Sequence, residues 1–213
     1  MKLYLSSYRI PTPRELAELL GKKSLNGVSV ALIPNAKDYY ASRVRDFKIG
    51  ELVSYMERLG LDVHTVDLRD YDKPEVLKGD LASYGLIWAM GGNTYMLRYE
   101  MRRSGFDTIV KGLLENGVVY GGDSAGALVA GLSIAGVEAA DEPEFAEEVI
   151  TQGLGLVPYV VLPHVDNPGF AAVPPVFKAA HSHKQVIELK DSQAVVFDGN
   201  THRVVTGTGS KNA

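Results

Sequence analysis

Short apolar runs alternate with longer amphipathic stretches over the first 130 residues of the chain. The apolar runs predict five strands, at residues 3–5, 28–33, 63–68, 85–90 and 118–120. The run at 28–33 is apolar on both faces apart from one serine, which is typical of a strand covered by helices on both sides.

Between these strands the sequence has helical periodicity. Apolar residues recur at spacings of three and four from Ile49 to Leu59, and the pattern stops at Gly60. The other stretches expected to be helical are residues 16–20, 96–103 and 108–114, with a short helix opened by Pro74. Alternating strands and helices predict an α/β fold with a mainly parallel central sheet, in which sites lie beyond the carboxyl ends of the strands.

The pattern weakens after about residue 135. The acidic segment 138–148 is expected to be a loop that enters a helix, and a short strand at 160–162 ends at Pro163-His164. The tail predicts strands at 186–189, 194–197 and 204–206, with a hairpin turn at Asp198-Gly199-Asn200. Since no linker, repeat or low-complexity stretch interrupts the chain, we expect a single domain over residues 1–213.

Composition narrows the range of partners. The 213 residues include 22 basic and 26 acidic side chains without a basic block, so neither nucleic acid nor an anionic membrane is an expected partner. The chain has no cysteine, which excludes disulfides, thiolate zinc sites and cysteine nucleophiles. No apolar run is long enough to span a bilayer or form a signal-peptide core, so we expect a cytoplasmic protein.

The strongest chemical signal is Gly122-Asp123-Ser124-Ala125-Gly126, which follows a predicted strand and precedes a helical stretch. This is the context of a G-x-S-x-G nucleophile elbow, where flanking glycines permit a tight turn that exposes the serine hydroxyl. The alternative interpretation is a glycine-rich turn in which Ser124 only caps the helix.

A second glycine-rich turn, Gly91-Gly92-Asn93-Thr94, follows the strand at 85–90. Glycine pairs let the backbone approach a ligand closely. If this strand lies beside the one at 118–120, the amides of Gly92 and Ala125 could form an oxyanion hole. Gly91, Asn93 and Thr94 would then contact substrate, although Asn93 or Thr94 could equally be a helix cap.

A serine nucleophile needs a base. His164 is the best placed of the five histidines, because it follows a short strand directly, whereas His64 lies inside a strand and His202 beside a hairpin. His181 and His183 together with His164 could hold a metal, but an H-x-H pattern without nearby carboxylates is weak, and we expect no metal.

The residues alone leave the acid that would orient His164 open. Asp166 lies two residues after it, Asp141 lies in the acidic segment, and Asp191 lies in the turn before the strand at 194–197. Most surface carboxylates are simply solvated, so composition does not choose among the three.

Taken together, these motifs resemble serine peptidase family S51, which includes aspartyl dipeptidase (peptidase E) and cyanophycinase. The resemblance covers about residues 1–207 and rests on L-Y-L-S-S, A-L-I-P-N-A, G-G-N-T, G-D-S-A-G-A and P-H, in this order. It implies a three-layer α/β/α sandwich similar to class I glutamine amidotransferases, with serine in place of cysteine on the elbow. It also implies hydrolysis of a peptide bond next to an acidic residue, a small peptide as partner and no cofactor, and it is compatible with a homodimer.

By this resemblance Ser124 is the nucleophile, His164 the general base, and Gly92 and Ala125 the oxyanion donors. The acid of the dipeptidase branch would fall at Ala139, so Asp141 would need a small insertion. In the cyanophycinase-like branch an acid precedes an alanine of the late turn by three residues, which fits Asp191 in D-S-Q-A. We therefore rank Asp191 first, Asp141 second and Asp166 third.

Other activities remain compatible with the same elbow, namely an esterase or amidase on another substrate, or a binding protein without catalysis. An acidic substrate would need a cation to receive it. The basic residues that follow the base are Lys178, His181, His183 and Lys184, and a solvated helix face explains them equally well.

Overall fold

A seven-stranded sheet forms the centre of the molecule in the computed structural model, which describes residues 1–207. The strand order is β3-β2-β4-β5-β1-β8-β9. Five of the strands are parallel, β1 (Lys2–Ser6), β2 (Ser29–Ile33), β3 (Asp62–Thr65), β4 (Leu86–Ala89) and β5 (Val119–Asp123). The antiparallel hairpin β8 (Gln193–Asp198) and β9 (Thr201–Thr206) extends the sheet beside β1.

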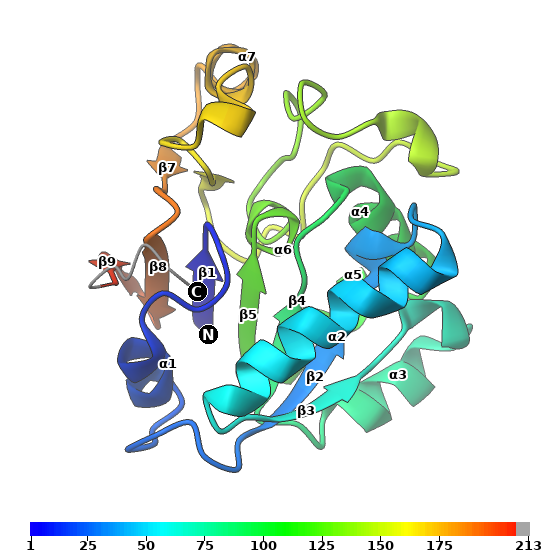
Figure 1. Ribbon diagram of the computed structural model, residues 1–213, viewed down its shortest axis with the longest axis vertical. Helices are drawn as coiled ribbons and strands as arrows, with labels where there is room; N and C mark the ends of the chain where they lie inside the picture. Colours follow the sequence, from blue (N-terminus) through cyan, green and yellow to red (C-terminus); the bar gives the residue numbers. More distant parts are fainter. Residues whose placement is uncertain (208–213) are drawn as a thin grey trace.

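Helices cover both faces of this sheet, giving three layers (Figure 1). One face packs against α1 (Pro13–Leu19) and α2 (Ser42–Arg58), whose buried residues share a core cluster with Trp88. The opposite face packs against α3 (Pro74–Leu81), α4 (Thr94–Arg103), α5 (Phe106–Glu115) and α6 (Ala125–Leu128). All four residues of β4 are buried, because a parallel strand covered on both sides needs no polar face. The expected α/β fold is confirmed, and β4 pairs with β5, so the condition under which Gly92 and Ala125 could lie close together is met.

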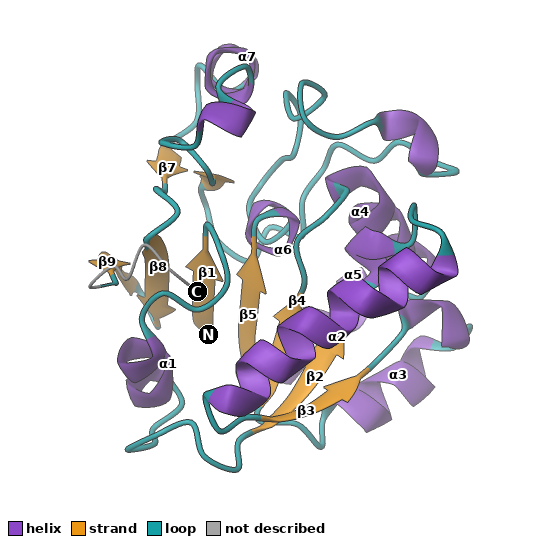
Figure 2. Cartoon of the chain, viewed as in Figure 1, coloured by secondary structure: helices purple, strands orange, loops and turns teal. Residues whose placement is uncertain are grey.

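A smaller unit lies at the carboxyl end of the main sheet. It consists of the parallel pair β6 (Val160–Leu162) and β7 (Val186–Glu188) with α7 (Val173–Ala180), as Figure 2 shows. The sequence did not predict α7, whose prolines at 174 and 175 stand in its first turn, where proline is tolerated. This unit supplies the segments that follow β6 and β7.

Two expectations need correction. The strand expected at 63–68 is β3, which ends at Thr65, and the chain then forms the 3₁₀ turn η2 (Leu68–Asp70), with the Asp67 side chain accepting from the Arg69 N–H. The acidic segment 138–148 contains only the 3₁₀ turn η3 (Pro143–Phe145) and no α-helix. Glu138, Asp141 and Glu147 of this segment accept hydrogen bonds from α4, and the other carboxylates are exposed.

We expected a single domain over residues 1–213, and the last six residues of that range, 208–213, lie outside the described residues. Among residues 1–207, no helix is both long and apolar enough to cross a membrane.

Candidate active site

Ser124 lies on a sharp turn between β5 and α6. Its backbone has φ 52° and ψ −113°, a strained conformation for a residue with a side chain. The Ser124 N–H donates to the carbonyl of Ser6 at 3.1 Å, which anchors the turn to the end of β1. At Gly126 a Cβ atom would lie 2.0 Å from the Ala89 carbonyl oxygen, so only glycine lets α6 start this close to β4.

His164 reaches the serine from the smaller sheet. It follows β6 by two residues, has a positive φ of 62°, and its Nε2 lies 2.9 Å from Ser124 Oγ. The imidazole stacks on the ring of Phe170, with ring centroids 4.3 Å apart, and is almost fully buried. The ring is thus held in one orientation with one nitrogen on the hydroxyl.

Asp191 lies on the other side of the imidazole. Its Oδ1 is 2.5 Å from His164 Nδ1, and its Oδ2 accepts from Asn167 Nδ2 at 2.8 Å. Burial by itself would raise the pKa of Asp191, but hydrogen bonds from His164, Asn167 and Ser7 outweigh it and hold the pKa below its usual value. An ionised carboxylate here favours the tautomer with the proton on Nδ1, which leaves Nε2 free to accept from Ser124.

The two other candidate acids lie elsewhere. Asp141 accepts hydrogen bonds from the backbone N–H and the hydroxyl of Thr94, at the start of α4, and burial raises its pKa. Asp166 accepts from the backbone N–H of Asp191 at 2.9 Å and so supports the turn that carries Asp191. Of the three, only Asp191 contacts His164 in residues 1–207.

The glycine turn after β4 runs beside the elbow. Gly92 has φ 152°, and a Cβ atom there would lie 2.2 Å from the Ala36 carbonyl oxygen. Gly91 and Thr94 line the same cavity as Ser124, together with Gly92. Asn93 does not, because its side chain caps α4 by accepting from Met96 N–H and donates to the Glu142 carbonyl. The expected substrate contact at Asn93 is therefore corrected to a helix cap.

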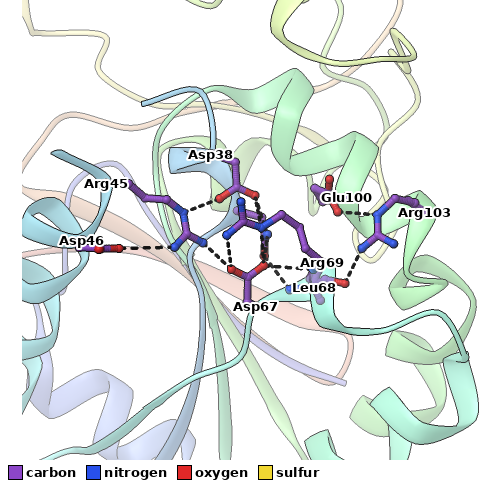
Figure 3. A network of polar contacts seen from close by, with 9 residues as sticks. Asp38, Arg45, Asp46, Asp67, Leu68, Arg69, Glu100 and Arg103 are labelled. Atoms are coloured by element: carbon purple, nitrogen blue, oxygen red, sulfur yellow. Dashed lines mark hydrogen bonds and ion pairs between the residues drawn. The ribbon is translucent and has the colours of Figure 1, made fainter. Parts of the chain in front are cut away.

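A polar network fixes the segment that packs behind this turn, as Figure 3 shows. Arg45 Nε donates to Asp38 at 2.6 Å, and its NH2 group donates to Asp67 at 2.6 Å. Asn35 donates to both carboxylates, and it opens the 3₁₀ turn η1 (Asn35–Lys37). The carbonyl of Ala36 then accepts from the Asn93 N–H at 2.8 Å, so the network holds the glycine turn in place.

Asp123, directly before Ser124, is a buried carboxylate that does not contact Ser124 Oγ or His164 through a hydrogen bond found in residues 1–207. Its Oδ1 accepts from Trp88 Nε1 at 2.9 Å. Burial raises the pKa of Asp123, against the opposing effects of the Trp88 hydrogen bond and the Lys37 charge. This side chain satisfies the indole N–H in the core and borders the floor of the cavity.

A cavity of about 640 Å³ opens above Ser124. Its cationic lining residues are Arg9, Lys37 and Lys48, and none of them forms an ion pair with a carboxylate of residues 1–207. Lys37 and Lys48 both approach the ring of Tyr40, at 6.0 and 5.3 Å from its centroid. Burial lowers the pKa of Lys37. Anionic groups of a ligand would meet these three side chains.

The basic residues after His164 are not placed to meet an anionic ligand in this cavity. Lys178 pairs with Glu188 at 2.8 Å, and neither it nor Lys184 lines the cavity. His181 is buried, with its Nδ1 on the Phe177 carbonyl at 2.8 Å. Within residues 1–207, no group of three or more histidine, aspartate or glutamate side chains is arranged to hold a metal ion.

Sequence reasoning missed several residues of the site. Ser7 and Arg9 follow β1, Lys37 follows β2, Lys48 lies in α2, and Asn167 and Phe170 follow His164 closely. The first three stand just beyond the carboxyl ends of strands, where sites of parallel sheets gather, and this position was a signal that could have found them. Ser7 is also the last residue of the L-Y-L-S-S motif, which carried no assigned role for it. Asn167 carries no such signal, since it reaches Asp191 through the fold of the β6–α7 connection.

The chain is similar in sequence to known peptidases. The model of peptidase family S51 matches residues 6–205. The chain is 29% identical to the uncharacterized peptidase Lin0382 of Listeria innocua over 160 residues, 71% of each chain. It is 28% identical to the uncharacterized peptidase Lmo0363 of Listeria monocytogenes, over 84% of this chain and 86% of that one.

Solved structures share the fold. One is the 1.5 Å crystal structure of a Listeria monocytogenes protein provisionally named peptidase E. It superimposes with a TM-score of 0.80 and 24% identity, covering 96% of this chain and 98% of that one. A peptidase from an acI-B1 Actinobacterium gives a TM-score of 0.70 and 20% identity, covering 96% and 87%. With its sequence matched to the family model over nearly its whole length, the chain belongs to peptidase family S51 and is a serine peptidase.

Proposed function

We propose that the enzyme hydrolyses peptide bonds through an acyl-enzyme on Ser124, with His164 as general base and Asp191 as the acid that orients it. The observation that carries this proposal is the continuous chain of hydrogen bonds from Ser124 Oγ through both ring nitrogens of His164 to Asp191 Oδ1, at 2.9 and 2.5 Å. A serine hydroxyl is a weak nucleophile, and a base in contact with it is the required activation.

The reaction has two halves. In the first, Ser124 Oγ bonds to the substrate carbonyl carbon while its proton moves to His164 Nε2, and His164 then returns that proton to the leaving amine as the C–N bond breaks. In the second, water attacks the ester carbonyl, giving a proton to His164, and the C–O bond to Ser124 breaks as the hydroxyl regains the proton. Asp191 stabilises the imidazolium that forms in each half.

The backbone N–H groups of Gly92 and Ala125 are the proposed oxyanion donors. Ala125 follows the nucleophile directly, and Gly92 lines the cavity beside it. Neither N–H donates to another group among the hydrogen bonds found within residues 1–207. Donors held by the elbow and by the η1 network need no reorganisation when the negative charge develops, which is why such positions are effective.

The substrate we propose is a small peptide with an acidic side chain next to the scissile bond. A cavity of about 640 Å³ suits a ligand of a few residues. Three cations without carboxylate partners line it, against one carboxylate, Glu51, that forms no ion pair within residues 1–207. The aspartates 123, 141 and 191 of the lining already accept hydrogen bonds from the protein. A negatively charged group therefore gains more partners on entering than a positively charged one does.

Three measurements test the proposal together. A fluorophosphonate probe should label the wild-type enzyme at Ser124, as located by mass spectrometry of the modified peptide. Ser124→Ala should fold normally, escape labelling and lose kcat by about 10⁴-fold or more, because removal of the nucleophile disables the whole unit. On a panel of short peptides and esters, peptides with aspartate or glutamate at the cleavage site should be turned over best. Activity of Ser124→Ala within about tenfold of wild type would refute the serine mechanism.

A further inference from the structure

Ser7 lies behind the triad, out of reach of any substrate. It is fully buried, does not line the cavity, and follows the last residue of β1. Ser6 pairs with Asp123 of β5 on one side and with Ala194 of β8 on the other. The end of β1 is therefore flanked by the elbow and by the turn that carries Asp191, and Ser7 projects from the strand between them.

The hydroxyl of Ser7 contacts both partners of the proton relay. It donates to Asp191 Oδ1 at 2.9 Å, accepts from the backbone N–H of His164 at 2.7 Å, and lies 3.3 Å from His164 Nδ1. A hydroxyl has one hydrogen and two lone pairs. The Nδ1 proton already points to Asp191, so a single arrangement satisfies every group: Ser7 gives its hydrogen to the carboxylate and a lone pair to the His164 amide.

These two hydrogen bonds act on the features that the mechanism needs. The one to His164 holds the backbone of a residue in the left-handed region, which carries an intrinsic cost for histidine. The one to Asp191 directs Oδ1 toward Nδ1 while Asn167 holds Oδ2. Ser7 is itself tied to the main sheet, since its N–H donates to the Gln193 carbonyl at 3.1 Å.

We propose that Ser7 is a positioning residue for this reaction. Its hydroxyl holds Asp191 and His164 in place relative to each other and to the end of β1, which anchors the turn of Ser124. The base and the acid come from the smaller sheet and the turn after it, whereas the nucleophile comes from the main sheet. Ser7 links these two parts. This inference rests on the proposed function, because it assigns Ser7 to the relay that the proposal uses.

The test replaces Ser7 with alanine and with cysteine, using Ser104→Ala as the matched control. Ser104 is also a buried serine, and its hydroxyl donates to the Glu100 carbonyl at 2.8 Å in a helix that does not carry the triad. Ser7→Ala should lower kcat by about 10- to 100-fold, the loss expected for one hydrogen bond to a charged group, with KM within about threefold. Ser7→Cys leaves no cavity, because its side chain is slightly larger, but it donates weakly, so it should fold even if the alanine variant does not and should lose at least about fivefold in kcat.

A second readout reports on the relay without any substrate. The proton between His164 Nδ1 and Asp191 should give a low-field proton NMR signal, assigned by its loss in His164→Ala. In Ser7→Ala and Ser7→Cys this signal should shift or broaden, and in Ser104→Ala it should stay. An unchanged signal with kcat within twofold of wild type, or an equal loss in the control, would overturn the role of Ser7. Failure of the wild type to react with a fluorophosphonate would instead refute the proposed function.

Discussion

Replacing Asp191 with asparagine keeps the size of the side chain but changes what its two outer atoms can do. In the native protein three donors converge on the carboxylate, from Ser7 and His164 on Oδ1 and from Asn167 on Oδ2. An asparagine can accept on its oxygen only, and its amide group is itself a donor. The amide group of the asparagine must therefore point at a hydrogen-bond donor, either Asn167 on one side or Ser7 and His164 on the other.

Either orientation damages the relay. With the amide nitrogen toward His164, the ring must lose its Nδ1 proton, and Nε2 then carries hydrogen and cannot accept from Ser124. With the oxygen toward His164, the contact with Asn167 is lost and the charge that stabilises the imidazolium is gone. We expect Asp191→Asn to lower kcat by about 10²- to 10⁴-fold, the range spanned by a lost orienting charge and a wrong tautomer.

Asp141→Asn is the matched control, because Asp141 is also a partly buried carboxylate that lines the cavity. Both donors of Thr94 approach the same oxygen of Asp141, so an asparagine can accept both. Its kcat should stay within about fivefold of wild type. The assay is steady-state hydrolysis of an acidic dipeptide, with the rate of fluorophosphonate labelling as an independent measure and thermal melting to verify folding. A larger loss in Asp141→Asn than in Asp191→Asn would refute the assignment and move the acid to the segment after α6.

Lys37→Met should raise KM for peptides with an acidic side chain by about tenfold or more while leaving kcat nearly unchanged, with Lys178→Met as an inert control outside the cavity. An equal effect on the matching amide peptides, which carry asparagine or glutamine, would show that Lys37 does not recognise charge. Asp123→Asn tests the buried carboxylate at the floor. Burial raises the pKa of Asp123 in the folded protein above its value of about 3.9 in the unfolded chain. Ionisation of this carboxyl therefore lowers the free energy of unfolding at pH 7, and it has no such effect at a pH below the unfolded value, where the group is protonated in both states. The asparagine loses the hydrogen bond from the Gly91 N–H at every pH, whereas only the carboxylate carries a cost of ionisation. The melting temperature of the variant relative to wild type should therefore be higher at pH 7 than below about pH 3.5, and a relative melting temperature that falls as the pH rises would contradict this.

Much of the fold and part of the site followed from short stretches of the sequence. The succession of strands and helices along the chain is visible in runs of apolar residues. The elbow at Ser124 and the turn at Gly92 depend on glycines where the backbone must bend or approach another chain segment. His164 could be selected because it follows a short apolar strand by two residues, after Pro163. Local chemistry is sufficient in these cases, since the same few residues both form the turn and carry the reactive group.

The partners of these residues required the tertiary structure. Three aspartates were equivalent in sequence, and only the fold brings Asp191, which is 27 residues from His164, onto the imidazole. Ser7 contacts groups 157 and 184 residues away, because β1 is inserted between β5 and β8 in the sheet. The cations of the cavity come from the ends of β1 and β2 and from α2, not from the basic residues that follow the base. The order of strands within the sheet and the docking of the β6–β7 unit onto it are set by burial of whole faces in the folded protein, a collective property that no local pattern encodes, and together they bring these side chains to Ser124.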